Sequence, residues 1–185
     1  MIILKKLYVI RHCEAQGQEA EAPLTELGMQ QADMLAEFLS TIHFDRIISS
    51  PFERSIQSIS PFAKRTGITI ETDERLTERV LSTEDLSDWL EKLEASFEEM
   101  ELSFAGGESS LEATKRVVEV LEEIKMSEAE TSVIVTHGNL LSLALKNYDE
   151  NFGFVNWKKL SNPDIFLLQF DGGQEVVERV WNSEE

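Results

Sequence analysis

The sequence predicts an α/β protein, a three-layer α/β/α sandwich around a mostly parallel sheet with an antiparallel edge strand. The apolar run 7–10 and the apolar centre of 131–136 are typical of strands buried on both faces of a parallel sheet. Amphipathic helical patterns alternate with these runs, which favours strand–helix–strand connections. Near the end, a turn at 171–173 separates two β-like segments, and this pattern predicts a hairpin at the sheet edge.

Composition is that of an ordinary globular chain. The 185 residues are 42% hydrophobic and 28% charged, which suits one domain with a sizeable core. We see no signal-peptide pattern and no apolar run long enough to span a bilayer. Cys13 is the only cysteine, so an internal disulfide is impossible and a reducing cytoplasm is the expected location. We therefore expect a single cytoplasmic domain over 1–185.

The net charge of the chain excludes some classes of binding partner. Lys plus Arg is 17 and Asp plus Glu is 35, which gives a formal net charge of −18. Such a charge argues against nucleic acid and against an anionic membrane. Any site for a small anion must then be a locally positive region on a protein whose overall charge is negative. The sequence contains no pattern that indicates an oligomeric state.

Polar residues follow the first predicted strand, at 7–10. Arg11, His12, Cys13 and Glu14 come directly after the apolar run. In open α/β sheets, ligands bind at the carboxyl ends of the strands, and an Arg–His pair there can hold an anion and attack it. Taken alone, the stretch fits a solvated strand end equally well.

Next, Thr25 predicts the cap of a helix that runs to about Thr41. A second strand, 46–49, leads into another helix start. Ser50 there fits an N-cap, Pro51 the first helical position and Glu53 the partner in a capping box. Arg54 then lies in the first turn, beside the positive end of the helix dipole. This helix should continue to 65, with a kink at Pro61.

The second half of the chain repeats the alternation. We expect a strand at 68–70, a loop at 76–79, a helix over 83–100, a helix from Ser109 to about Met126 and a strand at 131–136. Ser109 and Glu112 fit a capping box. His137 and Gly138 end the last of these strands, and Asn139 begins a helix to about Asn147.

The polar residues at these junctions fit one chemistry. Two guanidinium groups, from Arg11 and Arg54, match the oxygens of a phosphate monoester, and His137 adds a third contact. A neutral His12 can attack phosphorus, and Glu78 can protonate the leaving oxygen. This set needs neither a metal ion nor a cofactor.

Taken together, the motifs resemble those of the histidine phosphatase superfamily, the phosphoglycerate-mutase-like fold, over nearly the whole chain. The matching segments are Arg11-His12-Cys13-Glu14, Leu24 to Gly28 with Gln31 and Ala32, Ser49 to Arg54 with Gln57 and Ser58, Leu76 to Glu78, Gly107 to Ser109 and Thr136 to Gly138. The resemblance implies that His12 is the nucleophile and that Arg11, Arg54 and His137 bind the phosphoryl group. It also implies that Glu78 is the acid and later the base, and that the backbone N–H of Asn139 adds a phosphate contact.

Three departures from the family pattern matter. Cys13 replaces the usual Gly, and we interpret it as an inert buried thiol rather than an oxidisable one. Gln18 replaces an Asn that often touches the phosphate, so its binding role is the weakest assignment. No Trp-Glu-Gly-like run follows Glu78, which leaves Glu74 and Glu84 as alternative acids. His43, the third histidine, fits a surface position.

The sequence therefore predicts a metal-independent phosphomonoesterase for a small phosphorylated substrate. The alternatives are mutase-type phosphoryl transfer, dephosphorylation of phosphohistidine in proteins and, from another class, non-catalytic phosphate binding. Residues 79–106 are too short for the larger insertion of typical mutases and predict a small lid. We expect Trp89, Phe97 and Phe104 of this lid to form an apolar wall of the pocket, while the substrate itself stays open.

Overall fold

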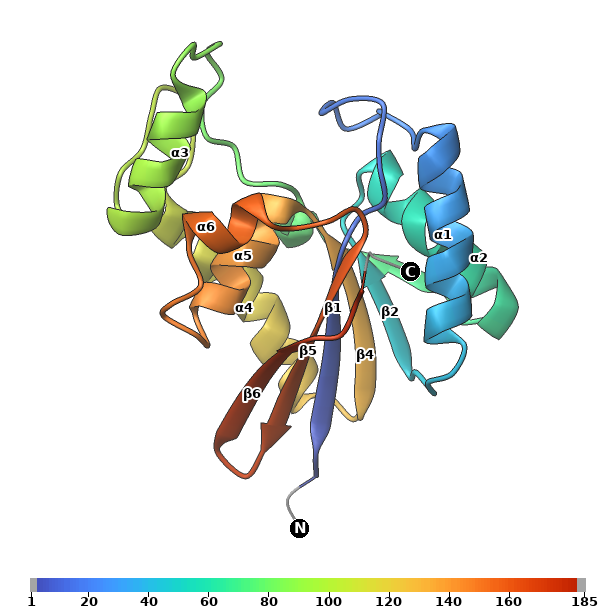
Figure 1. Ribbon diagram of the computed structural model, residues 1–185. Helices are drawn as coiled ribbons and strands as arrows, with labels where there is room; N and C mark the ends of the chain where they lie inside the picture. Colours follow the sequence, from blue (N-terminus) through green and yellow to red (C-terminus); the bar gives the residue numbers. More distant parts are fainter. Residues whose placement is uncertain (1–2, 183–185) are drawn as a thin grey trace.

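The computed structural model describes residues 3–182, which build one mixed sheet of six strands. The order across the sheet is β3-β2-β4-β1-β5-β6 (Figure 1). The strands are β1 (Lys5–Arg11), β2 (Arg46–Ser49), β3 (Ile70–Thr72), β4 (Thr131–Thr136), β5 (Asp164–Asp171) and β6 (Gln174–Arg179). The first four are parallel, and β5 and β6 form an antiparallel hairpin at one edge. The predicted mostly parallel sheet is confirmed.

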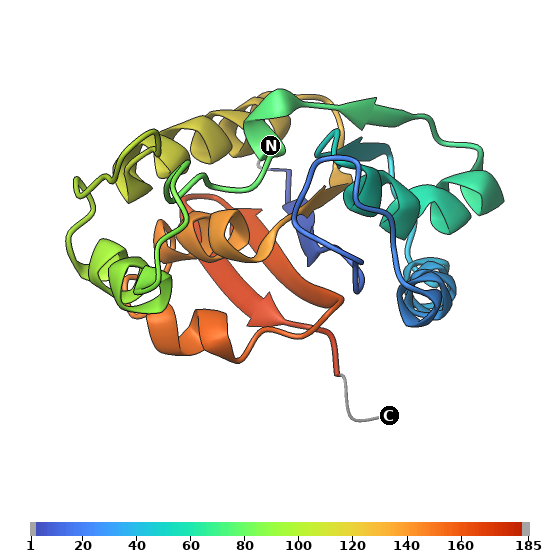
Figure 2. The same cartoon turned by 90° about the horizontal axis from the view of Figure 1, so that it is seen from above.

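Helices cover both faces of the sheet (Figures 1 and 2). On one side lie α1 (Glu26–Leu39) and α2 (Glu53–Thr66), and on the other lie α4 (Ser110–Met126) and α5 (Gly138–Lys146). Alternate residues of β1 enter the two cores, Tyr8 and Ile10 on the α1 side and Leu7 and Val9 on the α4 side. This is the three-layer sandwich that the apolar runs predict.

Two helix starts are fixed by side chains, as predicted. Thr25 caps α1 by accepting a hydrogen bond from the N–H of Gly28. Gly28 also has to be a glycine, because a Cβ there would lie 2.0 Å from the carbonyl oxygen of Glu14. At α4, Ser109 and Glu112 form a complete capping box.

The predicted start of α2 is wrong. The helix begins at Glu53, its N-cap is Phe52, and no side chain caps it. Ser50 lies too early for a cap, and its hydroxyl is instead hydrogen-bonded to the imidazole of His137 at 2.8 Å. The helix also continues through Pro61 to Thr66.

The segment 79–106 differs most from the prediction. Its helix, α3, spans only Trp89–Glu98, whereas the apolar pattern predicts 83–100. The preceding residues are held by the returning half of the segment, because the N–H of Thr83 and the hydroxyl of Ser82 both donate to the carbonyl oxygen of Ala105. This contact replaces the first helical turns.

Three further elements differ from the prediction. A short 3₁₀ turn, η1 (Glu74–Leu76), precedes the segment 79–106, and the third strand lies at 70–72 rather than 68–70. A five-residue helix, α6 (Phe154–Lys158), was not predicted at all. Short elements carry too little periodic pattern to be recognised in a sequence.

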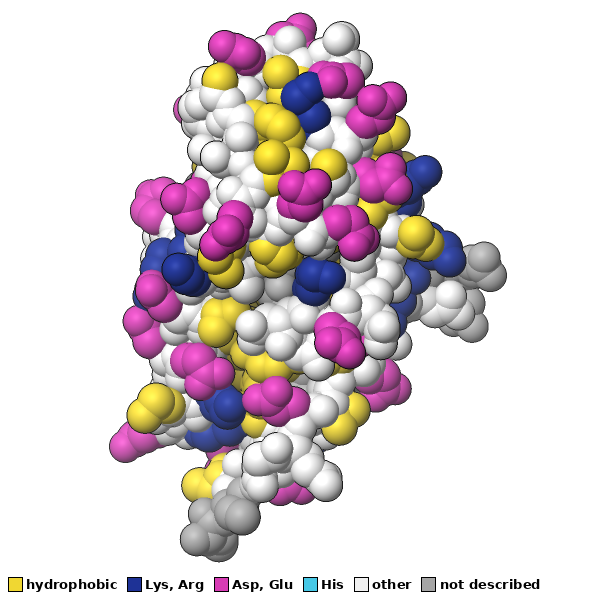
Figure 3. Space-filling view, turned by 90° about the vertical axis from the view of Figure 1, so that its left-hand side faces the viewer, with side chains coloured by type: hydrophobic (Ala, Val, Ile, Leu, Met, Phe, Trp, Pro, Cys, Tyr) yellow, Lys and Arg dark blue, Asp and Glu magenta, His cyan; other side chains and the backbone are white. Residues whose placement is uncertain are grey.

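Charge on the surface follows the composition. Figure 3 views the molecule from the left-hand side of Figure 1, and acidic side chains are scattered over that face among hydrophobic and fewer basic ones. Of the helices between residues 3 and 182, none combines the length and the apolar character that crossing a membrane requires.

Candidate active site

The sheet brings the two histidine motifs together. β1 and β4 are parallel neighbours, and Arg11 is paired in register with Thr136. The N–H of His12 donates to the carbonyl oxygen of Thr136 at 3.0 Å, and the rings of His12 and His137 lie 5.1 Å apart. β2 flanks β4 on its other side and delivers α2 with Arg54 to the same edge. Residues far apart in the sequence thus meet at the carboxyl ends of three strands.

Hydrogen bonds define the tautomer of the His12 imidazole. Its Nδ1 lies 2.7 Å from the carbonyl oxygen of Cys13, which can only accept, so Nδ1 carries the proton. Its Nε2 accepts a hydrogen bond from Nε of Arg54 at 3.2 Å and therefore presents its lone pair. Burial, together with the charges of Arg54 and Arg11, lowers the pKa of His12 to about 3. The imidazole is neutral at physiological pH, as a nucleophile must be.

Arg54 is held rigidly beside this nitrogen. The side chain is only 1% exposed, and Nη1 donates to the carbonyl oxygens of Gln18 at 3.1 Å and Glu19 at 2.8 Å. The guanidinium carbon also lies 5.0 Å from the centroid of the Phe52 ring. Burial lowers the pKa of Arg54, but a guanidinium remains charged. It is therefore a preorganised cation.

Arg11 approaches from the other strand. Gly138 makes room for it, since a Cβ at this position would lie 3.0 Å from Nε of Arg11. The Nη1 atom of Arg11 donates to the carbonyl oxygen of Leu160 at 3.3 Å, whereas the buried Nε has no partner among the described residues. An anion in the site would satisfy this free donor.

His137 is completely buried at the end of β4. Its Nε2 lies 2.8 Å from the hydroxyl of Ser50 and 3.4 Å from that of Ser55, while Nδ1 has no partner among residues 3–182. Burial first, and then the neighbouring His12 and arginine charges, lower its pKa well below the ordinary value. Neither serine was predicted as a partner of His137: Ser50 was interpreted as a helix cap, and Ser55 lies within α2.

Glu78 lies at the N-terminus of α5. Its carboxylate accepts hydrogen bonds from the backbone N–H groups of Asn139 at 3.0 Å, Leu140 at 2.9 Å and Arg79 at 2.8 Å. The N–H of Asn139, which was expected to contact phosphate, is thus engaged by Glu78 instead. A carboxylate suits this position because the free N–H groups and the helix dipole favour negative charge there.

Arg11 and Glu78 line a cavity of about 380 Å³, whereas His12, Arg54 and His137 are not among its lining residues. It is lined by Arg11, Gln18, Glu78, Arg79, Leu81, Trp89, Leu93, Asn139 and Trp157. Glu78 and Gln18 are thus at the cavity, whereas the alternative acids Glu74 and Glu84 are exposed and do not line it. Of the predicted apolar wall, Trp89 lines the cavity and Phe97 and Phe104 do not.

Some of the lining residues, Trp157 and Arg79 among them, were assigned no role from the sequence. Trp157 comes from the unpredicted helix α6. Arg79 was interpreted only as the charged neighbour of the predicted acid Glu78, although a basic residue in a loop beside a predicted acid is a signal for a binding role.

The remaining titratable residues lie outside the cavity. Cys13 is fully buried in the core beneath α1 and α2, and burial raises the pKa of its thiol to about 12. This agrees with the expectation of an inert thiol. His43 is on the surface, where its imidazole faces Asp45 at 3.7 Å. Within the described part of the chain, no group of three or more His, Cys, Asp or Glu side chains could hold a metal ion.

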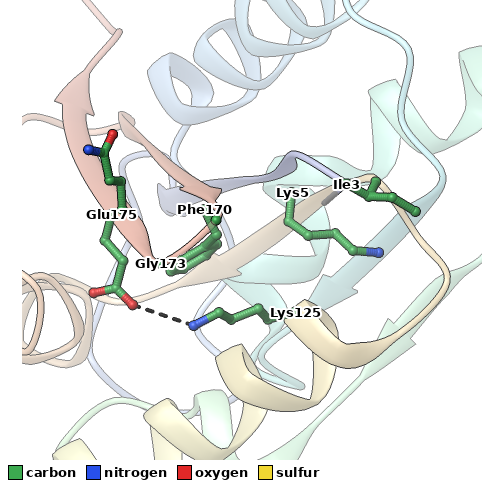
Figure 4. A pocket seen from close by; sticks show the side chains of 8 residues that line it. Ile3, Lys5, Lys125, Phe170, Gly173 and Glu175 are labelled. Atoms are coloured by element: carbon green, nitrogen blue, oxygen red, sulfur yellow. Dashed lines mark hydrogen bonds and ion pairs between the residues drawn. The ribbon is translucent and has the colours of Figure 1, made fainter. Parts of the chain in front are cut away.

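A second hollow lies at the opposite end of the sheet (Figure 4). Lys125 there pairs with Glu175 at 3.4 Å and lies over the ring of Phe170. Lys5 donates to the carbonyl oxygens of Ser127 and Ala129. Both cations are already partnered, so this hollow offers little to a ligand.

Known proteins resemble this chain in sequence and in fold. A family model of the histidine phosphatase superfamily (branch 1) matches residues 7–183. A putative phosphoserine phosphatase from Hydrogenobacter thermophilus is 29% identical over 154 residues, which are 75% of each chain. A probable phosphoglycerate mutase from Yersinia pestis is 29% identical over 157 residues, 76% of this chain and 73% of that one.

Solved structures agree with the sequence relatives. A mutant phosphoserine phosphatase from Entamoeba histolytica, in complex with phosphoserine, has a TM-score of 0.78 at 25% identity, covering 95% of this chain and 96% of that one. A mycobacterial glucosyl-3-phosphoglycerate phosphatase with inorganic phosphate also has a TM-score of 0.78, at 24% identity over 97% of both chains. The protein therefore belongs to the histidine phosphatase superfamily, and by family and fold it is a histidine phosphatase.

Proposed function

We propose that this protein hydrolyses small phosphate monoesters without a metal ion, through a phosphohistidine on His12. The observation that supports this most is the tautomer of His12. Its proton is held on Nδ1 by the carbonyl oxygen of Cys13, and its Nε2 lone pair faces a buried guanidinium. A neutral imidazole with one lone pair beside a cation is arranged to attack an anion's phosphorus.

The phosphoryl group would lie between Arg11, Arg54 and His137. The free Nε of Arg11 would donate to one oxygen. Arg54 would transfer its Nε donor from His12 to a second oxygen, which releases the lone pair for attack. If the hydroxyl of Ser50 donates to Nε2 of His137, the proton of this neutral imidazole is on Nδ1, where it can donate to a third oxygen.

Glu78 would protonate the leaving oxygen and then deprotonate the attacking water. It lines the same cavity as Arg11, which would hold one oxygen of the phosphoryl group. The three backbone N–H groups hold the carboxylate in one orientation. We assign Gln18, at the cavity rim, an auxiliary contact with the substrate.

Residues 79–106 would act as a small lid over this cavity. Leu81, Trp89 and Leu93 come from this segment and line the cavity, and Trp89 lies 6.5 Å from Trp157 of α6. Such a lid excludes water from the reacting groups. Because the single cysteine cannot form an internal disulfide, we propose the cytoplasm as the location.

Hydrolysis of p-nitrophenyl phosphate in EDTA tests the function. We expect turnover at the same rate in EDTA and in magnesium, because the arginines supply the positive charge. A rate that collapses in EDTA and returns with magnesium would contradict the proposal. No turnover at all would favour non-catalytic phosphate binding. Mutase-type transfer predicts instead that the phosphoryl group moves to an added hydroxyl acceptor faster than it is released as inorganic phosphate.

A further inference from the structure

Two residues of the matched motifs have no part in the proposed reaction. They are Glu108, in the segment 107–109, and Thr136, the last residue of β4. Neither lines the cavity, and neither does Arg116 of α4, with which Glu108 forms an ion pair. All three nevertheless bind the main chain on either side of Glu78.

The main chain that carries Glu78 has no regular structure of its own. Residues 77–88 form neither helix nor strand. Just before Glu78, the Nη1 atom of Arg116 donates to two carbonyl oxygens, that of Arg75 at 2.6 Å and that of Thr77 at 2.9 Å. One side chain of α4 thus supplies the backbone partners that a strand or a helix would otherwise provide.

Thr136 holds the carbonyl group between these two. Its hydroxyl donates to the carbonyl oxygen of Leu76 at 2.7 Å, and both residues are fully buried. Thr136 also precedes His137, and its own carbonyl oxygen accepts from the N–H of His12. The chain that leads to Glu78 is therefore fixed relative to the strand ends that carry the two histidines.

Glu108 orients the guanidinium of Arg116. Its Oε1 accepts from Nε at 3.0 Å and from Nη2 at 2.7 Å, so all three guanidinium nitrogens of Arg116 are engaged. The side chains of Arg116 and Glu108 are only 20% and 26% exposed. A charge-assisted contact that is mostly shielded from water holds its geometry better than an exposed ion pair.

Glu108 also binds the main chain that follows Glu78. Its N–H donates to the carbonyl oxygen of Val80 at 2.9 Å. Gly107 permits this close approach, because a Cβ there would lie 2.1 Å from the carbonyl oxygen of Leu81. The same carboxylate–guanidinium pair therefore fixes the chain both before and after Glu78.

Resting on the proposed function, we propose that Arg116, oriented by Glu108, is a positioning residue for the acid Glu78. A general acid has to lie within hydrogen-bond reach of the oxygen that it protonates, and a small displacement costs much of its effect. Arg116 does not line the cavity, so it acts through the position of Glu78 and not on the substrate. Thr136 supports the same stretch of chain from β4.

The test compares phenyl phosphate with p-nitrophenyl phosphate, which share the aryl ring but differ in their need for the acid. Phenolate is the more basic leaving group, so its departure gains more from a proton. The quantity measured is kcat/KM, because it reports the steps up to the departure of the leaving group. In Arg116→Met we expect it to fall roughly 10-fold on phenyl phosphate and less than about threefold on p-nitrophenyl phosphate. Glu78→Gln, measured alongside, should show the same pattern with a larger loss on phenyl phosphate.

Two further variants keep the test sharp. If circular dichroism shows that Arg116→Met does not fold, Arg116→Lys takes its place, because a single ammonium group cannot hold two carbonyl oxygens and a carboxylate at once. It should shift the ratio between the two esters in the same direction. Lys115→Met is the matched control, since it removes one positive charge from the exposed neighbour of Arg116 on α4 and should leave the ratio unchanged.

The outcomes separate this proposal from the proposed function. If the folded Arg116 variant slows both esters equally, or leaves both unchanged while Glu78→Gln shifts the ratio, Arg116 only stabilises the fold and the proposal is overturned. A shift as large in Lys115→Met would overturn it too, because the charge and not the hydrogen bonds would then be the cause. If Glu78→Gln leaves the ratio unchanged, the acid assignment of the proposed function is wrong, and the positioning role is lost with it.

Discussion

The two sides of the candidate active site are built in different ways. On the phosphoryl side, each group follows a central strand of the sheet or opens the helix after it, and backbone carbonyls hold His12 and Arg54. On the lid side, Arg79 and Trp89 come from a segment whose two halves pair with each other and which contacts α6 through aromatic rings. Under the proposed function, the groups at the strand ends carry out the chemistry that is common to every ester, while the segment 79–106 lies where the variable part of the substrate would be.

Replacing the nucleophile should have the largest effect and should not depend on the ester. His12→Ala removes the atom that attacks phosphorus, and loss of a nucleophile costs roughly 10⁴-fold or more in kcat. Steady-state rates on p-nitrophenyl phosphate and on an alkyl phosphate should fall together. Substantial activity of this variant on either ester would break the assignment of the chemistry to the sheet side.

Glu78 lies between the two sides, and its variant should separate the esters. Glu78→Gln keeps the size but has no proton to give, and general acid catalysis is worth roughly 10² to 10⁴ where the proton matters. An alkyl phosphate needs that proton and should be slowed strongly, whereas p-nitrophenolate leaves without it. The first chemical step has to limit the rate, which a burst measurement checks. If both esters slow equally under that condition, the acid lies elsewhere, and Glu74 and Glu84 are the next to replace.

Arg54→Ala should weaken catalysis of both esters by roughly 10² to 10³, the scale for one preorganised oxyanion partner. Arg65→Ala is the matched control, because Arg65 is an exposed residue in the last turn of the same helix. The ratio of kcat/KM between variant and wild type, measured on each ester, gives the answer. Near-normal efficiency of Arg54→Ala would make Arg54 a structural residue only.

The difference between the two sides also explains what the sequence could predict. Long apolar runs and amphipathic helices identify the sheet, and the strand ends then locate Arg11, His12, Arg54 and His137 without knowledge of any contact. The start of α2 was wrong because the hydroxyl of Ser50 has a tertiary partner, His137, that no local pattern reveals.

On the lid side, the interactions are between residues distant in sequence. Pairing of Thr83 with Ala105 shortens α3, and the five residues of α6 are too few for a periodic signal. The burial of Arg79, whose Nη2 has no partner among the described residues, likewise has no signal in the sequence.

The smallest predicted effect concerns stability. The pKa of His12 is about 3 in the folded protein and near 6.5 when unfolded, so the unfolded chain binds more protons between these values. Stability from this group is complete above about pH 6.5 and is lost as pH falls toward 3. From pH 6.5 to 5.0 we expect His12 alone to cost about 1 to 2 kcal/mol of unfolding free energy.

Chemical denaturation of wild type and His12→Gln at the two pH values measures this term. The variant should lose less stability on acidification, since one buried neutral imidazole is gone. The exposed His43 supplies the control variant His43→Gln, which should behave like wild type. Equal pH dependence of all three proteins would mean that His12 titrates normally in the fold.

Trapping the covalent intermediate tests the role of His12 most directly. Wild-type protein mixed with an excess of p-nitrophenyl phosphate and quenched within milliseconds should carry acid-labile, alkali-stable phosphate, and peptide mass analysis should place it on His12. The same treatment of His12→Ala should leave the protein unlabelled. Rapid turnover by wild type with no phosphate on His12, when burst kinetics show the second step to be limiting, would contradict covalent catalysis at this histidine.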